Sequence, residues 1–313
     1  MRCVVTGAAG FVGSHLGEYL LEHGHDVVGI DCLTDFYDPR LKEANLSLLQ
    51  RHDRFTLCRE DLLTAPLPYL FAGADTVYHL AGQPGVRPSW GAHFADYAAR
   101  NVLATQRVLE AARSVRLGKL VYASSSSVYG NAETHPTVET LRPQPVSPYG
   151  VTKLAGEHLC ELYRVGFGVP TASLRLFTVY GPRQRPDMAF SRLVSAAVHG
   201  TRFELYGEGT QTRDFTFVAD VVRAMSDAAR SDFTGVANIG GGSRTSMNEV
   251  IDIVSGLAGS IEVHRLPTQR GDVRDTAADT RAAFEGFGYV PTVSLTEGLA
   301  SMVEAERLAS VAA

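Results

Sequence analysis

Short β-branched runs alternate with longer segments of helical periodicity over the first part of the chain, and this alternation narrows the possible folds more than any other feature. Strands are expected at residues 2–6, 25–31, 54–58, 76–80, 119–124, 171–177 and 236–239. Helices are expected at residues 11–23, 40–51, 96–114 and 148–167. Because strands that alternate with helices are joined by right-handed crossovers, the pattern predicts an α/β fold with a doubly wound parallel sheet.

After about residue 178 the alternation gives way to loops rich in Gly, Pro and Arg, with helices expected near 190–199, 218–229 and 247–258. We therefore expect two domains. The first covers residues 1–178 and takes back the strand near 236–239, and the second is a smaller α/β substrate-binding region, mainly residues 179–313. Doubly wound sheets bind ligands beyond the carboxyl ends of their strands, so the second domain is expected to close over that edge.

Composition excludes several classes of protein. A formal net charge of −5 at pH 7 argues against a general nucleic-acid binder. The four cysteines form no CxxC pair, which indicates free thiols in a reducing compartment, and the ten histidines show no metal-ligand spacing, so no metal is expected. The chain opens in a strand without a signal-peptide pattern, and no apolar run approaches the roughly 18 to 20 residues that span a bilayer. We expect a cytoplasmic protein without a membrane partner.

The segment VVTGAAGFVGSHL, residues 4–16, places three glycines between an expected strand and an expected helix. Such glycines permit a tight turn and a close approach of backbone N–H groups to a pyrophosphate, whose charge then lies at the positive end of the helix. In this context the pattern predicts a dinucleotide-binding Rossmann domain rather than glycines that serve packing alone. The residues of the turn expected to contact the cofactor are Gly7, Gly10, Phe11, Val12 and Gly13.

Acidic residues end the next two expected strands. Asp31 can accept hydrogen bonds from both ribose hydroxyls of NAD and would repel a 2′-phosphate, which favours NAD over NADP. Asp61 and Leu62, in the segment EDL, are placed to meet the adenine. The alternative for Asp61 is that it only caps a helix.

Tyr149 and Lys153, in the segment SPYGVTK, are four residues apart and so share one face of an expected helix. A phenol titrates near 10 when unperturbed. A nearby ammonium and a positively charged nicotinamide both favour the phenolate and lower that pKa. Tyr149 is therefore expected to act as a base, with Lys153 beside it and anchoring the nicotinamide ribose. The alternative is a surface tyrosine packed along its own helix.

The TGxxGxxG turn at 6–13, the serine run SSSSVYG at 124–130 and the YxxxK pair together resemble the extended short-chain dehydrogenase/reductase superfamily, in its branch of nucleotide-sugar epimerases and dehydratases. The resemblance covers essentially the whole chain. Further matches are HLAGQPGVRPSW at 79–90, NVLATQ at 101–106, RLFTVYGPRQRPDMAF at 175–190 and GTQTRDFTFVADV at 209–221. The third of these, with GVR at 85–87 and DFYDPRLK at 35–42, looks most like the UDP-glucuronate 4-epimerases.

This resemblance implies an enzyme that holds NAD tightly, oxidises C4 of a sugar, lets the 4-keto ring turn over and reduces it on the other face, with no net redox change. It implies that Ser125 hydrogen-bonds the 4-oxygen beside Tyr149, so that Tyr149, Lys153 and Ser125 are the catalytic residues. Thr178 would line the sugar pocket, and Phe177 would pack near the nicotinamide. The other cofactor-binding positions that it implies are Leu80, Ala81, Gly82 and Asn101, with Lys42 as a looser match to a phosphate contact.

Ser126 and Ser127 stand where dehydratases similar to this family carry an Asp–Glu pair and decarboxylases carry a glutamate. Without a carboxylate to move protons at C6, dehydration is not expected. Serine hydroxyls can instead donate hydrogen bonds to a carboxylate at C6. Arg185 offers planar two-point recognition of that carboxylate. The alternative is that Arg185 holds loop carbonyls or a helix end.

For the nucleotide, Arg213 and Arg274 are isolated cations in glycine-bearing loops, and the resemblance implies that both contact the diphosphate. The alternative for each is a surface salt bridge. Arg192 and Gln211 are further candidates for the same cleft, and the segment FELYGEGTQ at 203–211 resembles one that seats uracil. The family also implies a homodimer built from the helices at 96–114 and 148–167, although packing within one chain explains their apolar stripes equally well.

We therefore expect NAD-dependent interconversion of UDP-glucuronate and UDP-galacturonate. The first alternative is a UDP-glucose 4-epimerase acting on neutral sugars. A UDP-glucuronate decarboxylase is a further alternative. An NAD-sensing binding protein is the last, but it need not retain Ser125, Tyr149 and Lys153 together.

Overall fold

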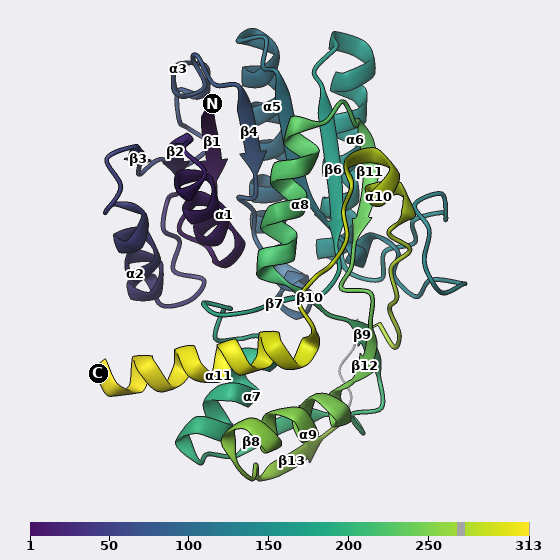
Figure 1. Cartoon of the computed structure of the whole chain (residues 1–313). Coiled ribbons are helices and arrows are strands. Elements are labelled where there is room, and N and C mark those ends of the chain that lie inside the picture. Colours follow the sequence, from purple (N-terminus) through teal and green to yellow (C-terminus); the bar gives the residue numbers. More distant parts are fainter. Residues whose placement is uncertain (268–272, 313) are drawn as a thin grey trace.

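The computed structural model describes residues 1–267 and 273–312, and a large parallel sheet dominates the upper part of the molecule in Figure 1. Within those residues the sheet has seven strands in the order β11-β6-β5-β4-β1-β2-β3, and every neighbouring pair is parallel. The strands are β1 (Arg2–Thr6), β2 (Asp26–Ile30), β3 (Phe55–Cys58), β4 (Thr76–His79), β5 (Lys119–Ser125), β6 (Thr171–Leu176) and β11 (Gly235–Ile239). Because the strand order reverses between β1 and β4, the predicted doubly wound α/β fold is confirmed.

Helices cover both faces of this sheet. Successive strand residues point to opposite faces, so Val121 packs in one apolar cluster and Leu120 and Tyr122 pack in the other. The Val121 cluster includes side chains of α1 (Phe11–Glu22), α2 (Pro39–Leu49), α8 (Val218–Arg230) and α10 (Arg281–Phe287). The other includes side chains of α3 (Leu67–Leu70), α5 (Ala104–Ser114) and α6 (Pro148–Phe167). Both faces are therefore buried, as a parallel sheet requires.

Helix α6 begins and ends where local chemistry directs. The side chain of Ser147 accepts a hydrogen bond from the backbone N–H of Gly150, and Pro148 occupies the first helical position. At the other end Gly168 takes a left-handed conformation with φ of +70°, which ends the helix without the strain that a side chain would bring. These signals explain why the predicted bounds of 148–167 agree with the structure.

The expected helix at 96–114 is interrupted in the structure. A short helix α4 (Phe94–Tyr97) leads into a π-helical turn η3 (Ala98–Leu103) and then into α5. Asn101 lies in this turn. Its side-chain amide accepts a hydrogen bond from the backbone N–H of Gln83 and donates one to the backbone oxygen of Gln83. Hydrophobic periodicity predicts a helix over this segment, but it does not register the extra residue of a π-turn.

Beyond β6 the chain builds a smaller layer around an apolar cluster that includes Phe190, Val250 and Leu299. This cluster joins α7 (Ala189–His199), α9 (Met247–Ala258) and α11 (Leu295–Ala312). Short paired strands complete it: β7 (Val179–Tyr180) with β10 (Thr216–Phe217), β8 (Phe203–Tyr206) with β13 (Val263–Leu266), and β9 (Thr212–Asp214) with β12 (Arg244–Ser246).

The proposed division into domains at residue 178 stays a prediction. Chain order alone does not describe it, because α8 and β11 both follow that residue and pack in the layers of the large sheet. Among the described helices, none is long and apolar enough to cross a membrane.

We predict that Gly13→Ala destabilises the protein, because an added Cβ would lie 2.0 Å from the carbonyl oxygen of Gly7. Relieving that overlap requires a backbone shift that costs about 1–3 kcal/mol. The matched control is Gly166→Ala in α6, where nothing lies within 4 Å of an added Cβ. The control should stabilise the helix by about 0.5–1 kcal/mol. Urea denaturation measures both changes, and equal midpoints for the two variants would contradict the prediction.

Candidate active site

Three adjoining cavities open at the carboxyl ends of the sheet strands. The turn cavity borders the glycine turn, the serine cavity contains residues 124–127, and the outer cavity lies beside β8. The turn and serine cavities share Phe11, Val12, Leu80, Gly82, Gln83 and Pro84, and the serine and outer cavities share Gly85 and Val86. Arg185 lines all three. A single extended ligand can therefore occupy them together.

The turn cavity fits a dinucleotide. Gly7 has φ of +74°, and a Cβ on it would lie 2.9 Å from the backbone nitrogen of Ala81, so the turn approaches β4 closely only because this residue is glycine. The first turn of α1 carries no acidic side chain, which leaves its positive end suited to a phosphate. The predicted cofactor residues that line the cavity are Gly7, Gly10, Phe11, Val12, Gly13, Asp31, Lys42, Asp61, Leu62, Leu80, Ala81 and Gly82.

Asp31 and Asp61 are both held by backbone groups at the cavity wall. The Asp31 carboxylate accepts hydrogen bonds from the N–H of Ala9 at 3.0 Å and of Leu33 at 2.8 Å. Asp61 accepts from the N–H of Leu63 at 2.9 Å and lies 3.6 Å from the Arg100 guanidinium. The hydrogen bond from Leu63 caps a turn and not a helix, since the next helix, α3, begins only at Leu67. Asp61 lies on the cavity wall, and its contact with the adenine stays a prediction.

Lys42 is buried at the same wall. Its ammonium donates to the backbone oxygen of Thr34 at 2.6 Å and to the Thr34 hydroxyl at 3.1 Å, and it lies 4.7 Å from the centre of the Tyr37 ring. Burial lowers the pKa of Lys42. In this structure the ammonium orders the loop that follows β2, and it borders the cavity from there.

Two predicted cofactor residues lie behind the wall instead of on it. Asn101 is 1% exposed, and its amide holds the backbone of Gln83 at 2.6 and 3.0 Å. Phe177, also 1% exposed, packs against Val128 and Tyr129. Packing in this small cluster draws its ring inward, and Leu176 and Thr178 are the β6-end residues on the wall of the serine cavity. That Phe177 packs near the nicotinamide stays a prediction.

Lys153 is the buried cation of the serine cavity. Its ammonium donates to the backbone oxygen of Ala123 at 2.8 Å and lies 5.0 Å from the centre of the Tyr122 ring. Burial lowers the pKa of Lys153 to about 8, and the Cys160 thiol and Glu157 carboxylate act in the opposite direction. Lys153 is therefore still largely an ammonium at neutral pH.

Tyr149 lies one helical turn before Lys153 and also borders the serine cavity. Burial raises the pKa of Tyr149, whereas a hydrogen bond from Ser125 and the charge of Arg185 lower it. The ring of Tyr97 packs edge-on against Tyr149 with centres 6.3 Å apart. Ser125 and Tyr149 are thus neighbours, as the resemblance implied, and the phenol needs further positive charge to ionise near neutral pH.

The four serines do different things. Ser124 is buried and donates its hydroxyl to the Glu157 carboxylate. Ser125 accepts a hydrogen bond from the backbone N–H of Ser127 at 3.1 Å and so begins the short 3-10 helix η4 (Ser126–Val128). Ser125, Ser126 and Ser127 are partly exposed on the wall of the cavity. The strand end therefore presents three hydroxyls to a ligand and uses the fourth for structure.

Arg185 follows β7 in the loop before α7 and borders the serine cavity close to Tyr149. Its Nε and Nη2 each donate to a carboxylate oxygen of Asp187 at 2.9 Å. The side chain of Arg185 is 18% exposed and that of Asp187 is 48% exposed. A largely solvated partner holds the guanidinium only weakly, so a substrate carboxylate can compete for it.

The outer cavity is lined by Arg192 and Gln211, both predicted for the nucleotide. Arg87 also lines it, with its guanidinium 4.4 Å from the centre of the Tyr206 ring. Arg87 was not predicted as a binding residue, although GVR at 85–87 matched the family. Its position in a 3-10 turn, η1 (Arg87–Ser89), depends on the fold of the loop after β4.

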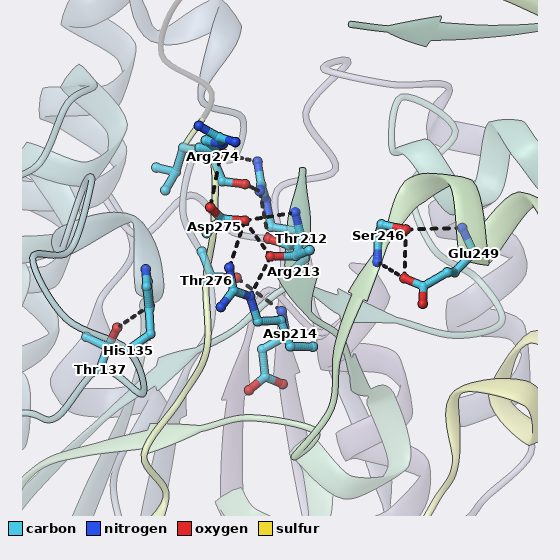
Figure 2. Close-up of polar contacts among 12 residues, drawn as sticks. His135, Thr137, Thr212, Arg213, Asp214, Ser246, Glu249, Arg274, Asp275 and Thr276 are labelled. Carbon is cyan, nitrogen blue, oxygen red and sulfur yellow. Dashed lines mark hydrogen bonds and ion pairs between the residues drawn. The ribbon is translucent and has the colours of Figure 1, made fainter. Parts of the chain in front are cut away.

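Arg213 and Arg274 lie in a separate polar cluster, drawn in Figure 2. The Arg213 guanidinium donates to the backbone oxygen of Thr212 at 3.0 Å, of Arg274 at 2.6 Å and of Val273. Arg274 is 87% exposed and lies 3.7 Å from the Asp275 carboxylate. In this structure Arg213 ties two segments of the smaller layer together, and neither arginine borders the three cavities described above.

Within residues 1–267 and 273–312, no three His, Cys, Asp or Glu side chains are grouped to hold a metal ion.

The turn cavity has further lining residues that the sequence patterns did not single out, among them Gln83, Arg100 and Thr34. Gln83 and Thr34 come from loops whose course no periodic pattern specifies, and Arg100 lies in the π-helical turn η3.

Residues 3–240 match the family described as "NAD dependent epimerase/dehydratase family". The chain is 44% identical over 310 residues to the "Uncharacterized UDP-glucose epimerase YtcB" of Bacillus subtilis, covering 97% of each chain. It is 36% identical to the "Probable UDP-glucuronate 4-epimerase" of Rhizobium meliloti, covering 97% of this chain and 96% of that protein. The crystal structure of UDP-glucuronic acid 4-epimerase from Bacillus cereus with UDP-glucuronic acid and NAD superposes with a TM-score of 0.95 at 42% identity, over 99% of this chain and 100% of that one.

We predict that burial of Lys153 makes stability depend on pH. Its pKa of about 8 in the folded protein lies below the ordinary lysine value of 10.5, so the unfolded chain binds more protons between these values. Stability should therefore rise with pH over that window, by on the order of 3 kcal/mol. The measurement is urea unfolding at pH 7 and pH 10.5 for the wild type and for Lys153→Met, which lacks this titration. A stability difference between the two proteins that does not change with pH would contradict the prediction.

Proposed function

The chain belongs to the NAD dependent epimerase/dehydratase family, and from this premise we propose that it interconverts UDP-glucuronate and UDP-galacturonate by inverting C4 of the sugar. The family and its NAD cofactor agree with the prediction from the sequence. The observation that carries the proposed substrate is the wall of the serine cavity: it offers Tyr149, three serine hydroxyls, Thr178 and Arg185.

We assign NAD to the turn cavity. The pyrophosphate would lie at the glycine turn and the start of α1, and Asp31 would accept hydrogen bonds from the adenosine ribose. Asp61 and Leu62 would meet the adenine, and Lys42 a phosphate. When bound, NAD supplies reversible hydride removal and return at C4 of the sugar. Asn101 would act indirectly, through the backbone of Gln83.

Proton transfer at the 4-oxygen falls to the residues of the serine cavity. Tyr149 would take the proton from the 4-OH, since Lys153 and Arg185 both supply positive charge that favours its phenolate. Ser125 would donate a hydrogen bond to the 4-oxygen and keep it directed at Tyr149. Returning the proton from Tyr149 then completes the step without consuming an acid or a base.

An enzyme that acts on UDP-glucuronate must also prevent loss of the sugar carboxylate as CO2. Oxidation at C4 creates a β-keto acid, which loses CO2 when the carboxylate aligns with the carbonyl π system. We propose that Arg185 exchanges Asp187 for the substrate carboxylate, and that Ser126, Ser127 and Thr178 hold this group out of alignment. Hydrogen bonds from these side chains would replace the water that the substrate carboxylate loses when it enters the partly buried cavity.

The outer cavity is our proposed site for the UDP group. Arg192 and Gln211 line it and would contact the nucleotide, and Arg87 adds a third polar side chain. The exposed Arg274 remains our candidate for a diphosphate contact. Arg213 would have to break its hydrogen bonds to the backbone oxygens of residues 273 and 274 to reach the diphosphate. We therefore propose that it holds these two residues in place.

The second candidate is a UDP-glucose 4-epimerase. One reason is that the relative with 44% identity is described as a UDP-glucose epimerase. Another is that Nε and Nη2 of Arg185 already donate hydrogen bonds to Asp187, so neither is open to a substrate carboxylate unless Asp187 is displaced. A decarboxylase is disfavoured because Ser126 and Ser127 offer no carboxylate, and an NAD-sensing protein has no use for Ser125, Tyr149 and Lys153 together.

We further propose a homodimer in the cytoplasm. Helix α6 exposes Val151, Leu162 and Val165 along one face, with exposed fractions of 48%, 61% and 69%. An apolar stripe of this kind marks a protein interface. All four cysteines are free, which suits a reducing compartment.

We predict that the purified protein, given UDP-glucuronate, forms UDP-galacturonate as detected by NMR. Arg185→Met should lower kcat/KM for UDP-glucuronate by about 10- to 100-fold more than for UDP-glucose, since only the acidic sugar loses a charge-assisted contact. Arg202→Met, which removes an exposed arginine paired with Glu262, is the control and should leave both values unchanged. Tyr149→Phe should abolish turnover of both sugars. Equal losses for the two sugars in Arg185→Met would exclude the carboxylate role.

For the dimer, Val165→Glu should convert the protein to a monomer in size-exclusion chromatography with light scattering, because a charge placed in an apolar interface is not solvated. Val311→Glu in α11 is the matched control, since Val311 is 89% exposed on another helix. An unchanged mass for Val165→Glu would place the interface elsewhere or show the wild type to be monomeric.

A further inference from the structure

A buried ion pair lies directly behind the serine run. The carboxylate of Glu157 in α6 faces the guanidinium of Arg175 in β6, with Nε to Oε1 at 2.9 Å and Nη2 to Oε2 at 2.7 Å. The two side chains are 4% and 5% exposed. Neither residue borders the turn, serine or outer cavity, so the proposed reaction assigns them no direct contact with substrate or cofactor.

The pair fastens the end of β5 to α6. Glu157 accepts the hydroxyl of Ser124, and one turn earlier in the same helix Lys153 donates to the backbone oxygen of Ala123 at 2.8 Å. Arg175 pairs with Ser124 across the β5–β6 ladder, so the guanidinium approaches Glu157 from the neighbouring strand. Consecutive residues of β5 are thus bonded to consecutive turns of α6, immediately before Ser125.

Arg175 makes two further hydrogen bonds through Nη1. Its Nη1 donates to the Tyr129 hydroxyl at 2.8 Å and to the backbone oxygen of Glu139 at 3.2 Å. The Tyr129 hydroxyl donates in turn to Asn238 in β11 at 2.7 Å. Four hydrogen bonds from one guanidinium, two of them to the same carboxylate, keep both charges in one geometry.

Stability alone does not account for such a pair, because well-packed apolar residues often replace a buried ion pair without loss of stability. Geometry offers a better account. We propose that Glu157, oriented by Arg175, is a positioning residue that fixes Ser125 and Lys153 relative to Tyr149. This inference rests on the proposed catalytic roles of Ser125, Tyr149 and Lys153.

The pKa of Lys153 depends on the groups that surround its ammonium. The titratable groups that face its ammonium are Tyr149, Glu157 and Cys160 from α6, Tyr122 from β5 and His79 from β4. Of these, Glu157, which is paired with Arg175, is a carboxylate that raises the pKa of Lys153 against the effect of burial. Burial lowers the pKa of Lys153 to about 8, and loss of the Glu157 charge should lower it further.

The test replaces both charges at once, since removing one would leave the other buried and unpaired. In Glu157→Gln/Arg175→Gln, kcat should fall about 10- to 100-fold while KM changes less than about threefold, as expected when reacting groups are displaced but binding surfaces are kept. The alkaline limb of the pH profile should move to lower pH. The matched control is Glu161→Gln/Arg164→Gln, an exposed pair on the same helix, which should match the wild type.

Ser124→Ala is the second variant and keeps the ion pair. It removes only the hydroxyl that joins Glu157 to β5, and should lower kcat by about 3- to 10-fold with the lysine titration unchanged. It tests the positioning role even if the double variant fails to fold, which circular dichroism would reveal.

NMR titration of ¹³Cε-labelled lysine gives a readout that needs no turnover. The chain has only three lysines, Lys42, Lys119 and Lys153, so Lys153→Arg assigns the signal. A lower Lys153 pKa in the double variant supports the inference even if the wild type fails to epimerise UDP-glucuronate, which would sink the proposed function alone. If folded Glu157→Gln/Arg175→Gln and Ser124→Ala both match the control in kcat, pH profile and lysine titration, the inference is wrong.

Discussion

The common direction of the strands in the large sheet is the constraint on which the rest of this structure depends. Parallel strands bring their carboxyl ends to one edge, and the order reverses there between β1 and β4. The glycine turn follows β1, Asp31 follows β2, the serine run ends β5, and Thr178 follows β6. Residues more than 170 positions apart therefore meet around one continuous set of cavities.

Burial and charge compete at this edge. Removal from water disfavours both the Lys153 ammonium and a Tyr149 phenolate, so burial lowers the pKa of Lys153 and raises that of Tyr149. The hydrogen bond from Ser125 and the positive charge of Arg185 act against this effect at Tyr149. The same guanidinium can pair with the carboxylate of an acidic sugar in place of Asp187.

The parts of the fold that were predictable from the sequence are those specified by signals within a few neighbouring residues. The strands of the large sheet, the glycine turn and the bounds of α6 follow from periodicity, capping and turn chemistry, which act over a few residues. Helix α10 and the two- to four-residue strands of the smaller layer were missed, because short elements carry little periodicity of their own. Helix α11 was missed although it is long, because its apolar residues do not form a clear stripe along one face. The π-turn that contains Asn101 was missed because it differs from an α-helix by a single extra residue.

The sequence by itself determined the doubly wound sheet, the dinucleotide turn and the pairing of Tyr149 with Lys153, because each depends on neighbours close along the chain. Only the tertiary structure decided which side chains border the cavities. It turned Phe177 inward, engaged Arg213 with backbone carbonyls, brought Arg87 to the outer cavity and set Glu157 against Arg175. Those outcomes depend on which distant carbonyls, carboxylates and rings packing brings within reach, and no local pattern encodes that.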